Sequence, residues 1–227
     1  MTTITLSTSE FTSTLGLAAR FAAPENYGTP LLASVLLCEL DGTLHMVASD
    51  RYRVVVARTG AEAPKGFKRL LPVADARRIR RIFVSSRRHD PDLELTYEDV
   101  PEQGGGNLVI DAKGGDFDVT LVVRDTAALT AKFPDLLKLF KLPAEPAADI
   151  AGFDPRYLEP FRHLAAPTEP LRFSRRGSVL LVEGTRAVGM LMGLRVSDAM
   201  KAPDWSHIVK TERKAPAKKA AARKAAS

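Results

Sequence analysis

The sequence lacks the features that mark secreted proteins and membrane proteins. Cys38 is the only cysteine among 227 residues, so no disulfide can form within the chain, and this fits a reducing cytoplasm. No stretch approaches the roughly 18 consecutive apolar residues that a membrane-spanning helix needs. The first residues, MTTITLST, lack the basic start and the apolar run of a signal peptide. We therefore expect a cytoplasmic protein with no membrane partner.

Motifs of catalysis and of cofactor binding are missing as well. The sequence has no GxxxxGK[ST] loop for phosphates and no GxGxxG segment after a strand. Its histidines are scattered without the spacing of metal ligands. Gly104–Gly106 lies between expected strands, which predicts a loop rather than a phosphate cradle. We therefore expect a binding protein and not an enzyme, with no catalytic residues, no cofactor and no metal site.

The excess positive charge is confined to one end of the chain. The formal net charge is +6, and residues 201–227 account for all of it, because they contain eight of the 33 basic residues and two of the 27 acidic ones. The other 200 residues contain 25 of each sign and are neutral overall. Lys, Ala and Pro dominate the end segment, which predicts a disordered tail that either binds nucleic acid nonspecifically or only aids solubility.

One pattern recurs along the rest of the chain: a strand, a helix and three further strands. The first copy covers about residues 2–58. Ser7 or Thr8 can cap its helix, with Glu10 completing a capping box, and Asp41-Gly42 predicts a hairpin turn. The expected strands of this copy are Thr3–Leu6, Leu32–Leu40, Leu44–Ala48 and Tyr52–Ala57.

The second copy covers about residues 67–124. Pro72 marks the turn from its first strand into a helix, and Ala76, Ile79, Ile82 and Phe83 give that helix its apolar face. Glycine runs separate the last three strands. The expected strands are Phe67–Leu71, Leu93–Glu98, Asn107–Ala112 and Phe117–Arg124.

The third copy covers about residues 147–197. Asp154 can cap a helix that begins at Pro155, and Pro160 should shorten or kink this helix. The connector before this copy, residues 125–146, is too apolar to extend freely into water and should pack on the protein. The expected strands are Ala148–Phe153, Leu171–Ser174, Val179–Glu183 and Val188–Val196.

Three parts of the sequence resemble the bacterial β sliding-clamp family, the β subunits of DNA polymerase III. PLLASVLL at 30–37 and ASDRYRV at 48–54 resemble the family's Pro-Val-Leu-x-Gly-Val strand and its Thr-Asp-Gly-His-Arg-Leu segment. KFPDLLKL at 132–139 resembles the Phe-Pro-Asp-Tyr-x-x-Val connector. FDPRYL at 153–158 and MGLRV at 192–196 resemble Phe-Asn-x-x-Tyr-Leu and Met-Pro-Met-Arg-Leu. In this order the motifs resemble a short, divergent member of the family over about residues 3–197.

The resemblance implies an α+β fold, the DNA-clamp fold. Repeated strand–helix–three-strand units would place helices on one face and antiparallel sheets on the other. Residues 1–143 would form a clamp domain of two repeats, similar to the middle domain of a clamp. Residues 144–200 would form a third repeat, similar to the end of the last domain, and 201–227 would be the basic tail.

The resemblance also implies a binding site. Clamps of this family bind short linear motifs of polymerases and clamp loaders in a hydrophobic cleft between their middle and last domains. Walls of Leu and Met can accept the Leu and Phe anchors of a peptide, while Arg53 and Arg195 can hold its polar groups. Taken singly, the aliphatic members could equally be core residues. The matching positions are Leu32, Ser49, Arg51, Tyr52, Arg53, Val54, Pro134, Lys138, Leu139, Met192, Gly193, Leu194, Arg195 and Val196.

Helices of these clamps face double-stranded DNA, where basic side chains can contact phosphates without reading sequence. The expected helix of the second repeat carries four arginines within five residues, opposite its apolar face. A solvated helix face is the plain alternative. The DNA-binding candidates are Arg20, Arg77, Arg78, Arg80, Arg81, Arg87, Arg88, Arg156 and Arg162, with Lys218, Lys219, Arg223 and Lys224 of the tail.

The chain also departs from the family. Gly193 stands where the family has Pro, and Arg51-Tyr52 where it has Gly-His, so the preferred peptide can differ. The family's ring has twelve repeats, so four chains of three repeats would complete one, and we expect a homo-oligomer. The resemblance implies a sliding clamp, a processivity factor that tethers a polymerase to DNA. The alternatives are a clamp-derived adaptor or regulator that does not encircle DNA, and an unrelated α+β enzyme.

Overall fold

The computed structural model describes most of the chain up to residue 193. The described residues are 2–85, 90–100, 105–113, 119–125, 127–140, 153–176 and 178–193. Residues 1–195 form one unit, and the second unit, 196–227, which contains the whole expected tail, lies outside the described residues. None of the helices in the described ranges has the length and apolar character needed to cross a membrane.

Local sequence signals fix the elements of the first repeat. The Ser7 side chain accepts a hydrogen bond from the backbone N–H of Glu10 (3.2 Å), which starts helix α1 (Thr8–Ala19) directly after strand β1 (Thr2–Ser7). Strands β2 (Ser34–Leu40), β3 (Thr43–Ser49) and β4 (Arg53–Glu62) follow. Asp41 and Gly42 adopt positive φ angles of 51° and 79°, as a tight hairpin turn between β2 and β3 requires.

The first two repeats exchange their first strands. Strand β5 (Lys68–Pro72) of the second repeat pairs with β2, whereas β1 pairs with β6 (Asp92–Val100). Strands β7 (Gly105–Lys113) and β8 (Val119–Asp125) complete an antiparallel sheet of order β1-β6-β7-β8. Neither repeat is therefore a closed unit on its own.

Helix α2 (Val73–Ile82) of the second repeat packs against α1 and buries Ala76 and Ile79. The expectation that Ile82 shares this apolar face is wrong, because its side chain is 38% exposed. Phe83, expected on the same face, is buried, although the helix ends at Ile82 and Phe83 adopts an extended conformation.

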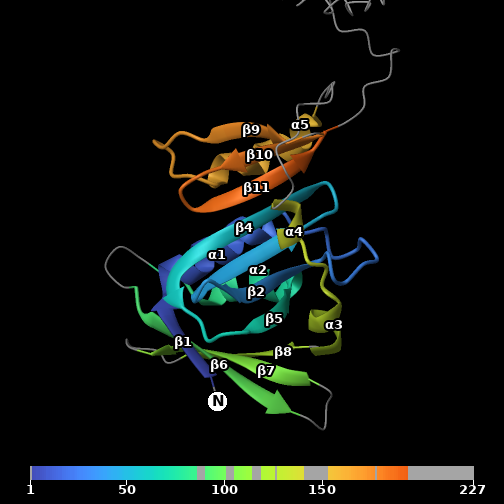
Figure 1. Ribbon diagram of the computed structural model, residues 1–227. Helices are drawn as coiled ribbons and strands as arrows, with labels where there is room; N and C mark the ends of the chain where they lie inside the picture. The colour runs from blue at the N-terminus through green and yellow to red at the C-terminus, as the bar shows by residue number, and fades with distance from the viewer. Residues whose placement is uncertain are drawn as a thin grey trace, which may run out of the picture. The chain divides into compact units, whose positions relative to one another are not determined.

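The third repeat extends the sheet of the first. Helix α5 (Pro155–Leu158) starts at the Asp154 cap and gives way to the 3-10 helix η2 (Glu159–His163) directly before Pro160, so the shortening expected from this proline is confirmed. Strands β9 (Arg172–Arg176), β10 (Val179–Glu183) and β11 (Ala187–Met192) form a meander. Because β11 pairs with β4, one antiparallel sheet has the order β5-β2-β3-β4-β11-β10-β9 (Figure 1).

The seven-stranded sheet is covered on both faces. Alternate residues such as Val35, Met46 and Val55 enter the main core beneath α1, α2 and η2. Their neighbours on the other face, such as Leu36, pack against Phe133 of the connector. The connector contains α3 (Ala127–Lys132) and α4 (Leu137–Phe140) and packs on the sheet, as its composition predicts. The expected α+β class is confirmed, while the domain division at 143/144 falls outside the described residues and stays a prediction.

Candidate functional site

A small apolar cavity opens where β4 meets β11. Its volume is about 110 Å³, and its walls come from the β3–β4 turn, the connector and the third repeat. Seven of the residues predicted for a peptide cleft line it together: Ser49, Arg51, Tyr52, Arg53, Val54, Leu139 and Met192. Val179 and Met190 complete the lining. We name this cavity the cleft.

The β3–β4 turn holds its shape through Asp50. The Asp50 carboxylate accepts hydrogen bonds from the backbone N–H groups of Tyr52 (3.1 Å) and Arg53 (2.9 Å), and it pairs with the Arg53 guanidinium at 2.7 Å. The Ser49 hydroxyl donates to the Arg53 carbonyl at 2.7 Å. Arg51 consequently has a φ of 80°, a left-handed conformation that glycine adopts more readily. The turn therefore presents Arg51 and Tyr52 to the cleft in a strained but well-supported geometry.

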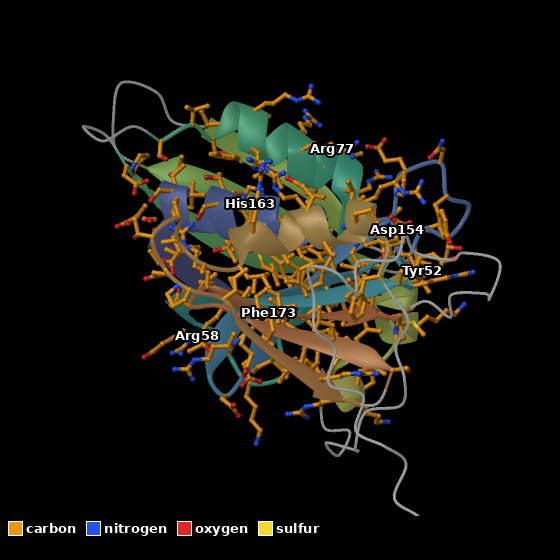
Figure 2. All side chains as sticks on the ribbon, turned by 90° about the horizontal axis from the view of Figure 1, so that it is seen from above. Tyr52, Arg58, Arg77, Asp154, His163 and Phe173 are labelled. Carbon is orange, nitrogen blue, oxygen red and sulfur yellow. The ribbon has the colours of Figure 1, made fainter. Side chains whose placement is uncertain are left out.

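Aromatic contacts connect this turn to the third repeat. The Arg53 guanidinium lies 5.0 Å from the ring centre of Tyr157 and 5.3 Å from that of Phe21. Tyr52 stacks on Tyr157 with ring centres 5.2 Å apart, and Figure 2 shows Tyr52 at the same end of the molecule as Asp154, near the start of α5. Desolvation by burial, with Asp50 nearby, raises the pKa of Tyr157, so the phenol stays neutral. The cleft thus depends on the docking of the third repeat.

Other predicted cleft residues lie elsewhere. Leu32 is a buried core residue, only 8% exposed, and does not line the cleft. Lys138 is exposed and pairs with Asp135 at 3.4 Å. The Gly193 backbone N–H donates to the Ser178 carbonyl at 2.8 Å, at the end of β11. Leu194, Arg195 and Val196 fall outside the described residues.

Pro134 lines a second groove of about 220 Å³, between the connector and strands β2, β3 and β5. Cys38 lies on the floor of this groove, and burial raises the pKa of its thiol to about 11. The thiol therefore stays protonated at neutral pH and acts as a small apolar side chain rather than a nucleophile. Within the described ranges, no three His, Cys, Asp or Glu side chains come together as a metal site would require.

Arginines from several elements line a cavity of about 490 Å³ on the helix side of the sheet. Three of them were predicted to contact DNA: Arg20 at the end of α1, Arg80 of α2 and Arg162 of η2. Arg58 and Arg186 line it too, together with His163, and the one acidic lining residue, Glu10, accepts a hydrogen bond from the Gly60 backbone N–H. Figure 2 shows nitrogen-tipped side chains gathered beside His163. We name this cavity the arginine pocket.

Gly16 allows α1 and α2 to bring two of these arginines together. The Arg80 side chain lies across α1 at this position, and a Cβ atom on residue 16 would come within 2.5 Å of the guanidinium carbon. Arg20 follows one turn later on the same helix. A larger residue at position 16 would therefore force the Arg80 guanidinium to shift from this position.

The other DNA candidates do not share this pocket. Arg77 is paired with Glu25 at 2.7 Å, and Arg156 with Asp154 at 2.6 Å, so their charges are partly neutralised. Arg78 and Arg81 are exposed on α2. Six candidates fall outside the described residues, namely Arg87, Arg88, Lys218, Lys219, Arg223 and Lys224.

Residues of both cavities that the sequence did not reveal have a common explanation. Val179 and Met190 lie in strands rich in apolar residues, and this pattern indicates core residues rather than a binding site. Arg58 follows a run of apolar residues in β4, and Arg186 lies in the turn between β10 and β11, so neither belongs to a basic cluster in the sequence. Arg58 and Arg186 become neighbours only through the pairing of β4 with β11, where the Arg58 backbone N–H donates to the Arg186 carbonyl at 3.1 Å.

His163 should make the stability of the fold depend on pH. Desolvation, with Arg20 and Arg162 nearby, lowers its pKa below the ordinary 6.5, and Glu159 opposes this only in part. Above pH 6.5 both the folded and unfolded chains carry a neutral imidazole, so His163 has no effect there. As the pH falls through 6.5 the unfolded chain takes up the proton first, so the free energy of unfolding should decrease until the lower, folded-state pKa is passed.

Thermal unfolding followed between pH 8 and pH 5 checks this prediction. We expect the melting temperature of His163→Gln to decrease less over this pH interval than that of the wild type. His45→Gln, on β3 outside the arginine pocket, is the control and should follow the wild-type curve. Parallel curves for wild type and His163→Gln would contradict the prediction.

Comparison with known proteins yields matches in structure but not in sequence. No model of a protein family matches the chain, and neither does any curated protein. The β subunit of DNA polymerase III from Thermotoga maritima matches with a TM-score of 0.64 at 14% identity, over 92% of this chain and 68% of its own. The Caulobacter crescentus β sliding clamp matches with 0.63 at 14%, over 92% and 68%. The Pseudomonas aeruginosa β subunit matches with 0.63 at 15%, over 86% and 66%. The chain therefore has the fold of the bacterial DNA polymerase III β subunits, the family that its sequence resembles.

Proposed function

We propose that the protein is a short sliding clamp, a processivity factor that tethers a DNA polymerase to double-stranded DNA in the cytoplasm. In this proposal the protein binds partners and catalyses no reaction. A polymerase or a clamp loader would insert a short linear motif into the cleft, and the arginine pocket would contact the DNA backbone. The clamp fold of the structural neighbours supports the general role, and the cleft supports the peptide partner.

The observation that carries the proposal is the composition of the cleft. Its apolar lining includes Met190, which is 4% exposed, and Met192, which is 51% exposed. Methionine side chains adapt their shape to an incoming apolar anchor. Arg51 stands at the edge over the Tyr27 ring (5.6 Å), where it can meet the polar groups of a peptide. A cavity of this kind suits one or two aliphatic or aromatic side chains rather than a whole small molecule.

Peptide binding tests the proposal. The probe is a short fluorescent peptide with Leu and Phe anchors, compared with the same peptide in which both anchors are Ala. Leu139→Glu and Met192→Glu change residues that are 41% and 51% exposed, so both variants should fold. We expect each to weaken binding of the probe by about 30-fold, equivalent to about 2 kcal/mol, as for a typical interface hot spot.

Val84→Glu is the control, because Val84 is 72% exposed and does not line the cleft. It should bind the probe as the wild type does. The proposal fails if the Ala peptide binds equally well, or if the two cleft variants keep the wild-type affinity.

The repeat count favours a second candidate, a clamp-derived adaptor that binds replication proteins without encircling DNA. Three repeats in one chain cannot close a ring alone, whereas four chains together could supply twelve. Retention on DNA separates the two functions. A ring should stay on a closed circle at high salt and slide off once the circle is cut, while an adaptor should behave alike on both forms.

A further inference from the structure

The cleft carries a positive charge that no carboxylate in the described part of the chain balances. The charged residues among those that line it are Arg51 and Arg53. Arg53 is paired with Asp50 at 2.7 Å, and both side chains are only 10% exposed. Arg51 is exposed, and within the described ranges its guanidinium forms no ion pair. The charge that a ligand of the cleft meets is therefore that of Arg51.

An aromatic contact positions this charge beside the cleft. The Arg51 guanidinium lies 5.6 Å from the centre of the Tyr27 ring, which comes from the segment between α1 and β2 and does not line the cleft. The face of an aromatic ring attracts a cation without neutralising its charge. Tyr27 is 39% exposed, so this contact also leaves Arg51 open to the solvent side. The guanidinium is thus held at the edge of the cleft and can still donate hydrogen bonds to a ligand.

The backbone at Arg51 is strained, and its neighbours hold it in place. Its φ of 80° lies in the left-handed region, which glycine adopts readily and arginine does not. The Ser49 hydroxyl accepts a hydrogen bond from the Arg51 backbone N–H at 3.2 Å, and the Asp50 carboxylate accepts from the next two backbone N–H groups. Strain of this kind at the edge of a binding site indicates that the side chain has a role there.

We propose that the peptide bound in the cleft carries an acidic side chain next to its apolar anchors, and that Arg51 selects this peptide by pairing with the carboxylate. The inference rests on the proposed function, because it concerns the peptide of the same cleft. It adds the charge of the partner. An acidic linear motif is bound, a neutral one is bound more weakly, and a basic one is rejected.

Desolvation of Arg51 gives this selection its physical basis. A peptide that places an apolar anchor in the cleft covers the neighbouring guanidinium and removes part of its water. A carboxylate replaces that water with charge-assisted hydrogen bonds, which are often bidentate with a guanidinium. A neutral residue in its place leaves a partly desolvated charge without a partner, and a basic residue adds repulsion. The cleft therefore discriminates against the wrong peptides as well as binding the right one.

Three versions of the fluorescent Leu/Phe probe test the inference, with Glu, Gln or Lys on both sides of the anchors. At about 0.1 M salt, where exposed charges are not fully screened, we expect the wild type to bind the Glu probe about fivefold more tightly than the Gln probe, equivalent to about 1 kcal/mol. The Lys probe should bind more weakly still. Arg51→Gly should fold, because the φ of this position suits glycine, and its preference for Glu over Gln should be less than twofold. Arg51→Glu should reverse the order and prefer the Lys probe.

Lys65→Glu is the matched control, because it makes the same change of charge at an exposed residue that does not line the cleft. It should keep the wild-type preference. The inference is overturned if the wild type binds the Glu and Gln probes equally, or if Arg51→Gly keeps the preference, even where binding still needs the Leu and Phe anchors. If no probe binds in a way that depends on its anchors, the proposed function fails and this inference fails with it.

Discussion

Replacing Phe161 with alanine is expected to lower the free energy of unfolding by about 3–5 kcal/mol, which is the usual loss for a buried phenylalanine. Phe161 is 2% exposed and meets Phe21 edge to face, with ring centres 5.0 Å apart. On its other side lies β11, where a Cβ atom on Gly189 would come within 2.9 Å of the Phe161 ring. This side chain therefore holds η2 between the end of α1 and the strand that joins the third repeat to β4.

The loss should concentrate in the third repeat, because Phe161 belongs to that repeat and packs at its junction with the first, beside the pairing of β11 with β4. Denaturant unfolding measures the total, and hydrogen exchange shows where protection is lost. Val84→Ala, at a residue 72% exposed, is the control and should change stability by less than about 0.5 kcal/mol. A Phe161→Ala protein that loses under 1 kcal/mol, or loses protection evenly along the chain, would contradict this account of how the third repeat docks.

Weaker docking of the third repeat should also weaken peptide binding in the cleft. Val179, Met190 and Met192 of the third repeat form one side of it, and Tyr157 stacks on Tyr52 of the opposite side. We expect Phe161→Ala to bind the Leu/Phe peptide more weakly than the wild type, although Phe161 does not line the cleft. Peptide binding in the cleft and docking of the third repeat therefore both depend on the junction between β4 and β11.

The elements of this fold could be predicted because their signals are local. Ser7 and Asp154 cap helices, Asp41-Gly42 turns a hairpin and Pro160 interrupts a helix, and each effect depends on a few neighbouring residues. Strand pairing is not local. The alternating apolar residues of β1 or β5 could pack on any sheet with an apolar face. The sequence of one repeat therefore does not indicate that its first strand pairs with the other repeat. The exchange of first strands and the joining of β4 to β11 therefore became visible only in the structure.

The same division applies to the sites. The cleft was predicted through the resemblance of motifs, and seven of the predicted residues do line one cavity. For the arginines the sequence could show which helix face is exposed but not which charges are already paired. Glu25 lies 52 residues from Arg77 in the sequence and neutralises it at 2.7 Å, which no pattern along the chain reveals. Arg20, Arg80 and Arg162 come from three helices and meet only in the folded protein.

These pairings change which arginines should matter for DNA. Arg77 already has a carboxylate partner, whereas in the described part of the chain Arg20 and Arg80 have no side-chain ion pair. Arg162 pairs with Glu159 at 2.9 Å but is 69% exposed, so that pair is weak in water. Clustered guanidinium groups repel one another, and phosphates that enter the arginine pocket would relieve this repulsion while releasing counterions from the DNA.

The variant that replaces Arg20, Arg80 and Arg162 with glutamate should therefore bind duplex DNA far more weakly. Each lost phosphate contact reduces the slope of log affinity against log salt by about 0.9, so three contacts reduce it by roughly 2.7. If both proteins bind equally at 1 M salt, this difference corresponds to roughly 500-fold weaker binding at 0.1 M. Affinity measured by fluorescence anisotropy on a labelled duplex across a salt series gives both numbers.

The control for this variant carries the same change of charge away from the arginine pocket: Lys65, Arg124 and Lys132, all exposed, are replaced with glutamate. Both proteins keep the basic tail, so any contribution of residues 201–227 cancels in the comparison. If the pocket contacts DNA, the slope falls only in the pocket variant, whereas a general effect of net charge would lower it equally in both. An unchanged slope in the pocket variant would mean that the tail, not the arginine pocket, contacts DNA. The helix face would then be an ordinary solvated surface.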